Sequence, residues 1–290
     1  MFPFNLTGPE FLVFYLGLAI AAAWLAWQLR HRWEPEPVAG DWIDDPYLLA
    51  YLRGGRSHLL RVAVLSLIDR ELLEVRGDAL RTAGVDSVKK VQRLLDQAIL
   101  VGFLSPGKAG DIFKNQHVLE VAAGYEQQLV DLHFVPEEAL RNRRKQLSVV
   151  IALPLLAVAV TKIIVAVTHG HSNIGFLIVL GIISTVAIYM LCNPFRTLAG
   201  NGAVAQAEEL FAGLKSRGKS LSLRSPTNEL VLLAAVYGME ALPDSVAGLM
   251  KPINMHRDTH VGSSCGSSCG SSCGGGCGGG CGGGCGGCGG

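Results

Sequence analysis

The chain has 290 residues, with 25 basic and 24 acidic side chains and a formal net charge of +1. This balance excludes a globally basic nucleic-acid-binding protein, which carries an excess or a stripe of Lys and Arg. Charge is nearly absent from three apolar runs and from the C-terminal end of the chain. The composition therefore predicts membrane spans, polar segments between them and a separate tail.

Residues 11–29 carry no charge and are about as long as a helix that crosses a bilayer, roughly 20 residues. They predict a first transmembrane helix that follows a short extracytoplasmic segment, residues 1–10. A secretory signal peptide is the alternative, because residues 21–23 are small. However, no basic residue precedes the apolar run, and Arg30 and Arg32 follow it, which favours an uncleaved anchor.

Residues 30–40 read as a Pro-rich linker, and residues 41–147 as a mostly helical cytoplasmic domain. Apolar residues recur with helical periodicity from Leu59 to Ile68, after a shorter helix around residues 48–52. The stretch 72–82 then alternates around Gly77 and Asp78, which predicts a β-hairpin with a Gly-Asp turn.

Two helices followed by a hairpin resemble a winged-helix module. A DNA-binding interpretation would use six side chains of this region: Arg56, His58, Arg61, Arg70, Arg76 and Arg81. Acidic residues are interspersed with them and would repel phosphate. The pattern therefore disfavours nucleic acid as a partner and favours a small interaction or scaffold domain.

Residues 149–168 and 174–192 are the second and third apolar runs, and only the short stretch HGHSN separates them. Basic residues follow the first run, precede the second and follow the third, and such residues mark the cytoplasmic side. All three spans thus predict the N-terminus outside and the C-terminus inside. We expect Lys162 to reach the outer interface, and His169 and His171 to form a polar turn instead of a metal site.

Residues 193–261 predict a second cytoplasmic helical segment. Its apolar stretch, residues 230–242, is too short to span a membrane and contains Glu240, so it indicates an amphipathic or buried helix. The chain contains no Walker loop, GxGxxG, HExxH or GxSxG motif. It therefore predicts no catalytic residue, no cofactor-binding residue and no enzyme activity.

The motifs DPYLLAYLRGG, RELLEVRG and ELVLLAAVYGMEAL, the paired apolar runs and the Gly/Cys tail together resemble an uncharacterised family of bacterial membrane proteins. Members of that family share most of this layout and often end in Gly-rich tails with repeated Cys. The resemblance covers nearly the whole chain and implies a location in the bacterial cytoplasmic membrane. The resemblance implies an architecture but does not imply an activity.

From Gly262 to Gly290 every residue is Gly, Ser or Cys. This composition offers almost no apolar surface to offset the entropy of ordering the backbone, so it predicts a disordered tail. Cysteines recur every fourth residue and then after three: Cys265, Cys269, Cys273, Cys277, Cys281, Cys285 and Cys288. In a reducing cytoplasm these seven thiols should stay free.

Three hypotheses fit the repeat. Its short accessible units suit an enzyme that modifies one cysteine after another, as in ribosomally made peptide precursors. Alternatively, the thiolates could bind a soft metal, Zn(II) or Cu(I), or buffer thiols, with His256 and His260 as weaker candidate ligands. The third hypothesis is an inert tail on an interaction scaffold. The sequence as a whole predicts a mainly α protein with three transmembrane helices, a winged-helix-like cytoplasmic domain and this tail.

Overall fold

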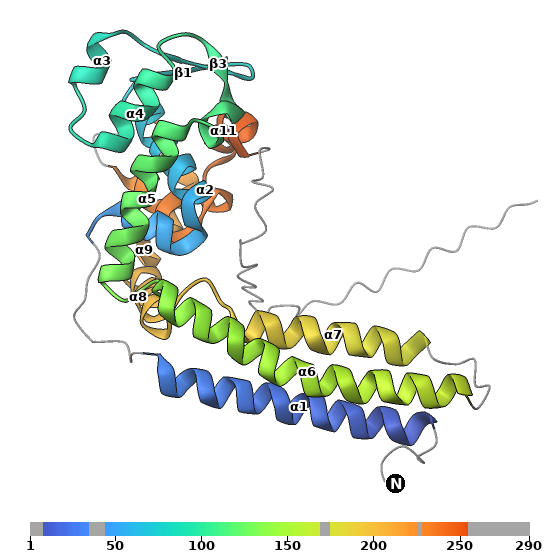
Figure 1. Cartoon of the computed structure of the whole chain (residues 1–290). Coiled ribbons are helices and arrows are strands. Elements are labelled where there is room, and N and C mark those ends of the chain that lie inside the picture. Colours follow the sequence, from blue (N-terminus) through green and yellow to red (C-terminus); the bar gives the residue numbers. More distant parts are fainter. Residues whose placement is uncertain (1–7, 35–43, 169–174, 225–227, 255–290) are drawn as a thin grey trace, which may run out of the picture.

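The computed structural model describes residues 8–34, 44–168, 175–224 and 228–254. Three long helices lie side by side in a bundle (Figure 1): α1 (Gly8–Trp33), α6 (Glu138–Thr168) and α7 (Gly175–Cys192). Each is long and apolar enough to cross a membrane. The predicted mainly α fold with three membrane helices is confirmed.

Few side chains of the bundle face its interior. Phe11, Tyr15, Leu155 and Ile188 belong to its small buried cluster, and the hydroxyl groups of Tyr15 and Ser184 lie 3.1 Å apart inside it. Most of the other apolar side chains point outward, and no more than 22% of any span is buried. Such a surface is stable in lipid, where exposed apolar side chains need no protein cover.

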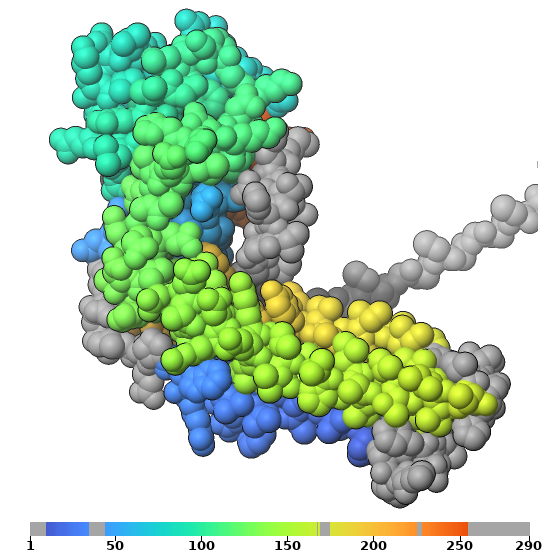
Figure 2. Space-filling view, in the orientation of Figure 1, coloured from blue at the N-terminus to red at the C-terminus, as the bar shows by residue number. Residues whose placement is uncertain are grey.

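The remaining elements form an extramembrane domain at one end of the bundle (Figure 1). Before α6 they are α2 (Pro46–Asp69), β1 (Leu73–Arg76), β2 (Ala79–Thr82), α3 (Asp86–Lys89), α4 (Leu94–Gly102), β3 (Gly107–Lys108), the 3₁₀ helix η1 (Ala109–Phe113) and α5 (Gln116–Asp131). After α7 they are α8 (Leu198–Leu210), α9 (Ala212–Arg217), η2 (Gly218–Ser220), α10 (Glu229–Tyr237), η3 (Met239–Ala241) and α11 (Asp244–Asn254). Figure 2 shows that this domain extends to one side of the bundle axis, so the molecule is bent.

Helix α2 consists of two parts. Asp45 begins it by accepting a hydrogen bond from the Tyr47 backbone N–H at 3.0 Å, and Pro46 occupies its first turn. Gly54 and Gly55 interrupt the helical backbone, and Gly55 has a φ of 68°, which a glycine adopts without strain. The kink separates the shorter and the longer helix that the apolar pattern predicts.

The expected hairpin is present as β1 and β2, which pair antiparallel from Leu73 opposite Thr82 to Arg76 opposite Ala79. Gly77 in the turn has a φ of 61°. The short strand β3 adds to β2, so the sheet order is β1-β2-β3. This sheet lies at the end of the domain away from the bundle (Figure 1).

The two chain segments on either side of the membrane hairpin share one hydrophobic core. α10 packs along α2, and its residues Leu230, Leu233 and Ala234 are almost completely buried. The apolar stretch at residues 230–242, expected to be an amphipathic or a buried helix, therefore contains a buried helix. The domain closes only after the chain has crossed the membrane twice between α5 and α8.

His58 lies where α2 meets α10. Its side chain is buried, and its Nε2 donates a hydrogen bond to the carbonyl oxygen of Ala234 at 3.0 Å. Burial, reinforced by the nearby Arg53 guanidinium, lowers the pKa of His58 to about 4. His58 is therefore neutral in the folded domain near pH 7.

We predict that His58 makes the folded domain less stable in acid. Because its folded pKa of about 4 lies below the unfolded value of 6.5, the unfolded chain binds the proton first. Stability is then lost as the pH falls from about 6.5 towards 4, by up to about 3 kcal/mol. Thermal unfolding of the purified protein between pH 7.5 and 4.5 should show a steeper fall for wild type than for His58→Gln. The exposed His117→Gln is the matched control, and a wild-type curve parallel to that of His58→Gln would contradict the assignment.

Candidate functional site

The candidate residues of the tail lie outside the described residues. This holds for all seven tail cysteines, for His256 and His260, and also for His169 and His171. The hypotheses on the tail therefore stay predictions. Within the described ranges, no three His, Cys, Asp or Glu side chains gather closely enough to hold a metal ion. Cys192 is a free, buried thiol at the end of α7.

Lys162 lies in the last two turns of α6, and its Nζ is 4.8 Å from the centroid of the Phe11 ring. Phe11 is in the first turn of α1, so this contact is at the bundle end away from the extramembrane domain. An ammonium group over an aromatic face is stabilised by the ring quadrupole. Lys162 is thus near the end of its span. That its ammonium group reaches the membrane interface stays a prediction.

Five of the six side chains considered for DNA binding make contacts within the domain, and the sixth, Arg81, is exposed. Arg70 forms an ion pair with Asp96 at 3.6 Å, and Arg76 forms one with Glu74 at 2.9 Å. Arg61 lies over the Phe113 ring, 5.7 Å from its centroid. In addition, α10 covers α2, the helix that would have to enter a groove. These residues do not form an accessible recognition helix.

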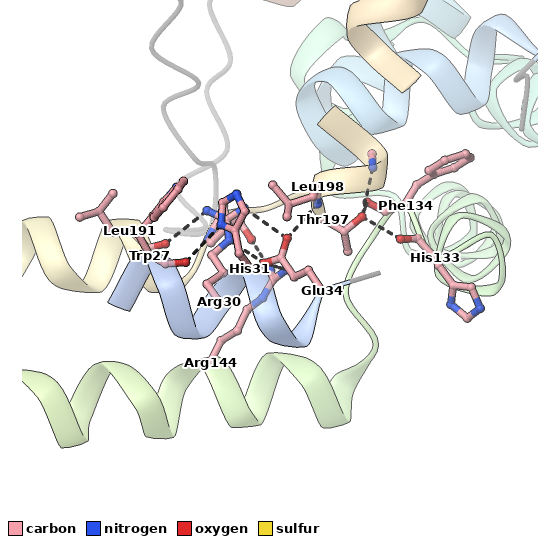
Figure 3. A network of polar contacts seen from close by, with 12 residues as sticks. Trp27, Arg30, His31, Glu34, His133, Phe134, Arg144, Leu191, Thr197 and Leu198 are labelled. Carbon is pink, nitrogen blue, oxygen red and sulfur yellow. Dashed lines mark hydrogen bonds and ion pairs between the residues drawn. The ribbon is translucent and has the colours of Figure 1, made fainter. Parts of the chain in front are cut away.

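A buried polar network, which the sequence reading missed, joins the spans to the domain (Figure 3). Its centre is Glu34, which directly follows α1 and whose side chain, without the backbone, is 1% exposed. Glu34 Oε1 accepts hydrogen bonds from Arg144 Nη2 of α6 and from Arg30 Nε of α1, both at 2.5 Å. Glu34 Oε2 accepts the backbone N–H of Leu198, the first residue of α8, at 2.8 Å. We name this the Glu34 network.

Both arginines of the Glu34 network also bind the chain at the end of α7. Arg144 Nη1 donates to the carbonyl oxygen of Pro194 at 3.0 Å, and Arg30 Nη1 donates to that of Leu191 at 3.4 Å. One carboxylate and two guanidinium groups thus connect the ends of all three spans that face the extramembrane domain. They also satisfy backbone groups that α7 and α8 would otherwise leave unpaired at their termini.

Thr197 extends this connection into the domain. Its Oγ1 donates to the carbonyl oxygen of His133 at 2.7 Å and accepts the backbone N–H of Gly200 at 3.1 Å, which caps α8. The backbone N–H of Thr197 donates to the Phe134 carbonyl oxygen at 3.1 Å. Gly200 lies so close to this carbonyl that an added Cβ would meet the oxygen at 2.3 Å. The start of α8 is therefore fixed against the segment between α5 and α6.

A second set of arginines reinforces the same region. Arg53 of α2 forms an ion pair with Glu208 of α8 at 2.6 Å and also donates to the carbonyl oxygen of Val236. Arg196, between α7 and α8, donates to the Arg53 carbonyl oxygen at 2.7 Å. Burial and the neighbouring Arg53 lower the pKa of Arg196. Together these contacts hold α2, α8 and α10 to the segment that leaves the membrane.

One signal for the Glu34 network is present in the sequence. Arg30 and Glu34 are four residues apart, the spacing at which opposite charges meet on a helix. Because prolines follow Glu34, the sequence pattern predicted that residues 30–40 form a linker. The structure continues α1 to Trp33, so that Arg30 lies in its last turn and Glu34 follows directly, with its backbone N–H bonded to the Arg30 carbonyl oxygen at 3.2 Å.

No family model, curated protein or solved structure matches this chain. The resemblance to a family of bacterial membrane proteins is therefore still a hypothesis from sequence motifs. The arrangement itself shows a membrane bundle and an extramembrane domain that are joined through buried charges. Chemically, the Glu34 network orients structural elements, and its carboxylate has no face open to a substrate.

We predict that Glu34→Gln strongly destabilises the protein. The substitution keeps the size of the side chain but leaves the buried Arg144 and the half-buried Arg30 without a counter-charge, which costs roughly 3–5 kcal/mol. Glu74→Gln, which removes the carboxylate of the exposed pair with Arg76, should change the unfolding free energy by less than about 1 kcal/mol. Thermal unfolding of both variants in the same detergent measures the difference. Equal shifts in melting temperature would show that the Glu34 network contributes no more than a surface pair.

Proposed function

We propose that this protein is a membrane-anchored carrier that presents its cysteine repeat to an enzyme that modifies the cysteines one at a time. The sequence of the tail supports this role, because each unit offers one cysteine between small residues and has no apolar side chain to bury it. The carrier needs no catalytic residue of its own. The modifying enzyme would be a separate protein.

The main support for the proposal is the position of the last helix of the folded domain relative to the repeat. α11 ends at Asn254, and the Gly/Ser/Cys repeat begins at Gly262. Val246, Met250 and Ile253 fix α11 in the core, where it contacts η1 and α2. In Figure 1, α11 lies in the half of the domain away from the bundle. This position supports access by an enzyme from solution, because the repeat follows a folded anchor and does not follow a membrane span.

We also propose that the domain and tail face the cytoplasm of a bacterial cell and that the N-terminus faces outward. Basic residues near the domain end of the bundle support this orientation: Arg32, Arg143 and Lys145 are exposed there. The proposed orientation keeps the seven thiols in a reducing compartment. Free thiols are the form that a modifying enzyme or a soft metal needs.

Metal binding is the second candidate function. Seven thiols within 24 residues, from Cys265 to Cys288, exceed the four ligands of a tetrahedral Zn(II) site, and fewer suffice for Cu(I). His256 and His260 could add ligands next to the repeat. An interaction scaffold with an inert tail is the remaining alternative.

Intact-mass spectrometry of the protein from its native host tests the proposal. We expect the denatured chain to exceed its sequence mass by multiples of one constant increment, because each modified cysteine adds the same group. Replacing all seven tail cysteines with serine should remove the increments, whereas Cys192→Ser, which alters the buried thiol of α7, should keep them. A mass excess that is present only under native conditions and disappears with a chelator would instead identify bound metal. A mass equal to the sequence mass in both conditions would contradict both functions.

A further inference from the structure

The ends of the three spans that face the extramembrane domain are strongly basic. They comprise residues 24–34, 141–150 and 189–198, all of which the structure describes. The one acid in these stretches is Glu34, which is buried in the Glu34 network. The same stretches contain seven arginines and lysines: Arg30, Arg32, Arg141, Arg143, Arg144, Lys145 and Arg196. This part of the molecule therefore carries a local excess of positive charge, although the chain as a whole is nearly neutral.

The Glu34 network brings three exposed cations to one level of the bundle. Arg144 binds Glu34 at 2.5 Å, which holds α6 against the end of α1. Arg143 and Lys145 are the immediate neighbours of Arg144. Arg32 is two residues before Glu34. Each of the three cations is therefore within about 3 Å of this contact along its helix axis.

The same contacts determine where these cations point. Successive residues of an α-helix are about 100° apart around its axis. Because Arg144 points into the bundle, Arg143 and Lys145 are directed to either side of it, and both are exposed. On α1, Arg30 binds the end of α7, so Arg32 is on the opposite side of the helix and is also exposed. We name Arg32, Arg143 and Lys145 the basic collar.

Exposed aromatic side chains lie next to the basic collar, on the side of the spans. Trp27 of α1 is 46% exposed, and Tyr189 of α7 is 55% exposed. Arg30 Nη1 donates to the Leu191 carbonyl oxygen at 3.4 Å, and each aromatic residue is two or three positions before this contact. The two aromatic side chains are therefore at a similar depth, and Figure 3 shows Trp27 and Leu191 at this end of the Glu34 network. Trp and Tyr are enriched at the level of lipid headgroups.

The acids nearest to the basic collar lie on its domain side. Residues 11–33, 139–166 and 175–207, which the structure describes throughout, contain no Asp or Glu. Residues 137–138 are exposed glutamates, but they precede Arg143 by five and six positions. This is about 8 Å along α6 towards the domain, which is about one Debye length. Glu36 follows α1 in the sequence and lies outside the described residues. Lipid headgroups around the spans would therefore meet the cations before any of these acids.

We infer that the basic collar and its aromatic neighbours bind the headgroups of anionic phospholipids in the leaflet on the domain side. Arg and Lys donate charge-assisted hydrogen bonds to phosphate oxygens. An anionic headgroup is preferred over a zwitterionic one because it brings a net negative charge to the cations. The apolar spans next to the collar favour a lipid over a free phosphate, because the acyl chains of a lipid cover such spans while its headgroup contacts the cations.

Bound headgroups would act on the contacts that fix the domain to the bundle. The Glu34 carboxylate balances only one of the two guanidinium groups that it binds, so the Glu34 network keeps a positive charge. Arg143 and Lys145 add two more charges next to Arg144. Anionic headgroups at the basic collar reduce the repulsion among these cations. This inference is independent of the proposed function, because it involves neither the tail nor a modifying enzyme.

Quenching of tryptophan fluorescence by brominated lipids tests the inference. Of the four tryptophans, Trp24, Trp27 and Trp33 lie in the last part of α1, next to the basic collar, and Trp42→Phe removes the fourth from every chain. The full chain is placed in phosphatidylcholine vesicles that contain brominated phosphatidylglycerol or brominated phosphatidylcholine. We expect the anionic lipid to bind about three- to fivefold more strongly at low salt. The preference should shrink in about 0.5 M NaCl. Equal quenching by the two brominated lipids at low salt would overturn the inference.

Matched variants distinguish the basic collar from the charge of the whole chain. The collar variant removes three charges: Arg32→Gln, Arg143→Gln and Lys145→Gln. The control variant removes three exposed charges of the extramembrane domain: Lys89→Gln, Lys90→Gln and Lys114→Gln. We expect the collar variant to bind both lipids equally and the control variant to keep the wild-type preference. A collar variant that keeps the preference, or a control variant that loses it to the same extent, would contradict a lipid site at the collar.

Two further variants guard against a loss of folding. Arg32→Lys combined with Arg143→Lys keeps the charge of the basic collar and should keep the preference. The single change Arg143→Gln leaves two collar charges in place and should lower the preference by part of the full amount. Unchanged melting temperatures in detergent would confirm that these chains fold. An unchanged preference in folded Arg143→Gln would count against the inference.

Soluble anions distinguish a lipid site from a site for free phosphate. Inorganic phosphate should reduce the preference for phosphatidylglycerol no more than NaCl does at the same ionic strength. If phosphate removes the preference where NaCl leaves it, the collar takes a soluble anion, and the inference of a lipid site is overturned.

Discussion

The carboxylate of Glu34 lies where three membrane helices end and the folded domain begins. Glu34 is 6% exposed and Arg144 is 2% exposed, so the charges of this pair are largely withdrawn from water. Buried charges are tolerated only when they are paired and hydrogen-bonded. Glu34 meets this condition by binding two arginines and the first N–H of α8 at once. Arg30, Arg144 and the Leu198 N–H can all bind the Glu34 carboxylate only when α1, α6 and the start of α8 are in this arrangement. This constraint fixes the domain relative to the bundle.

Much of the remaining structure depends on that arrangement. The extramembrane domain is built from segments on both sides of the membrane hairpin, and its core requires α10 to meet α2 after the chain has returned from the membrane. Thr197 and Arg196 guide this return by binding the backbone before α6 and in α2. α11 then packs on the completed domain and sets the point from which the cysteine repeat continues. The anchor in the membrane and the base of the tail are thus parts of one folded unit.

Local patterns in the sequence predicted the parts of this fold that local physics determines. Long uncharged runs identified the three spans, and the Gly77-Asp78 pair identified the hairpin, because the turn needs a residue that accepts a positive φ. The pairing of α10 with α2 was not predictable, because it joins residues as far apart as His58 and Ala234, which are 176 positions apart. No periodicity in either segment indicates its partner. Glu34 was missed for the same reason, since Arg144 is 110 positions away. The tail candidates came from composition alone, and they lie outside the described residues.

The most direct test of the account is the distance between α1 and the domain. The Glu34 network holds the end of α1 that faces the extramembrane domain. Nitroxide labels can be attached at Trp24 of α1 and Glu120 of α5, two exposed positions, in a chain whose native cysteines are replaced by serine. Pulsed electron paramagnetic resonance in lipid nanodiscs should give one narrow distance distribution, which broadens in Glu34→Gln and stays narrow in Glu74→Gln. A distribution of the same width in all three chains would contradict the claim that the buried carboxylate fixes the domain to the membrane bundle.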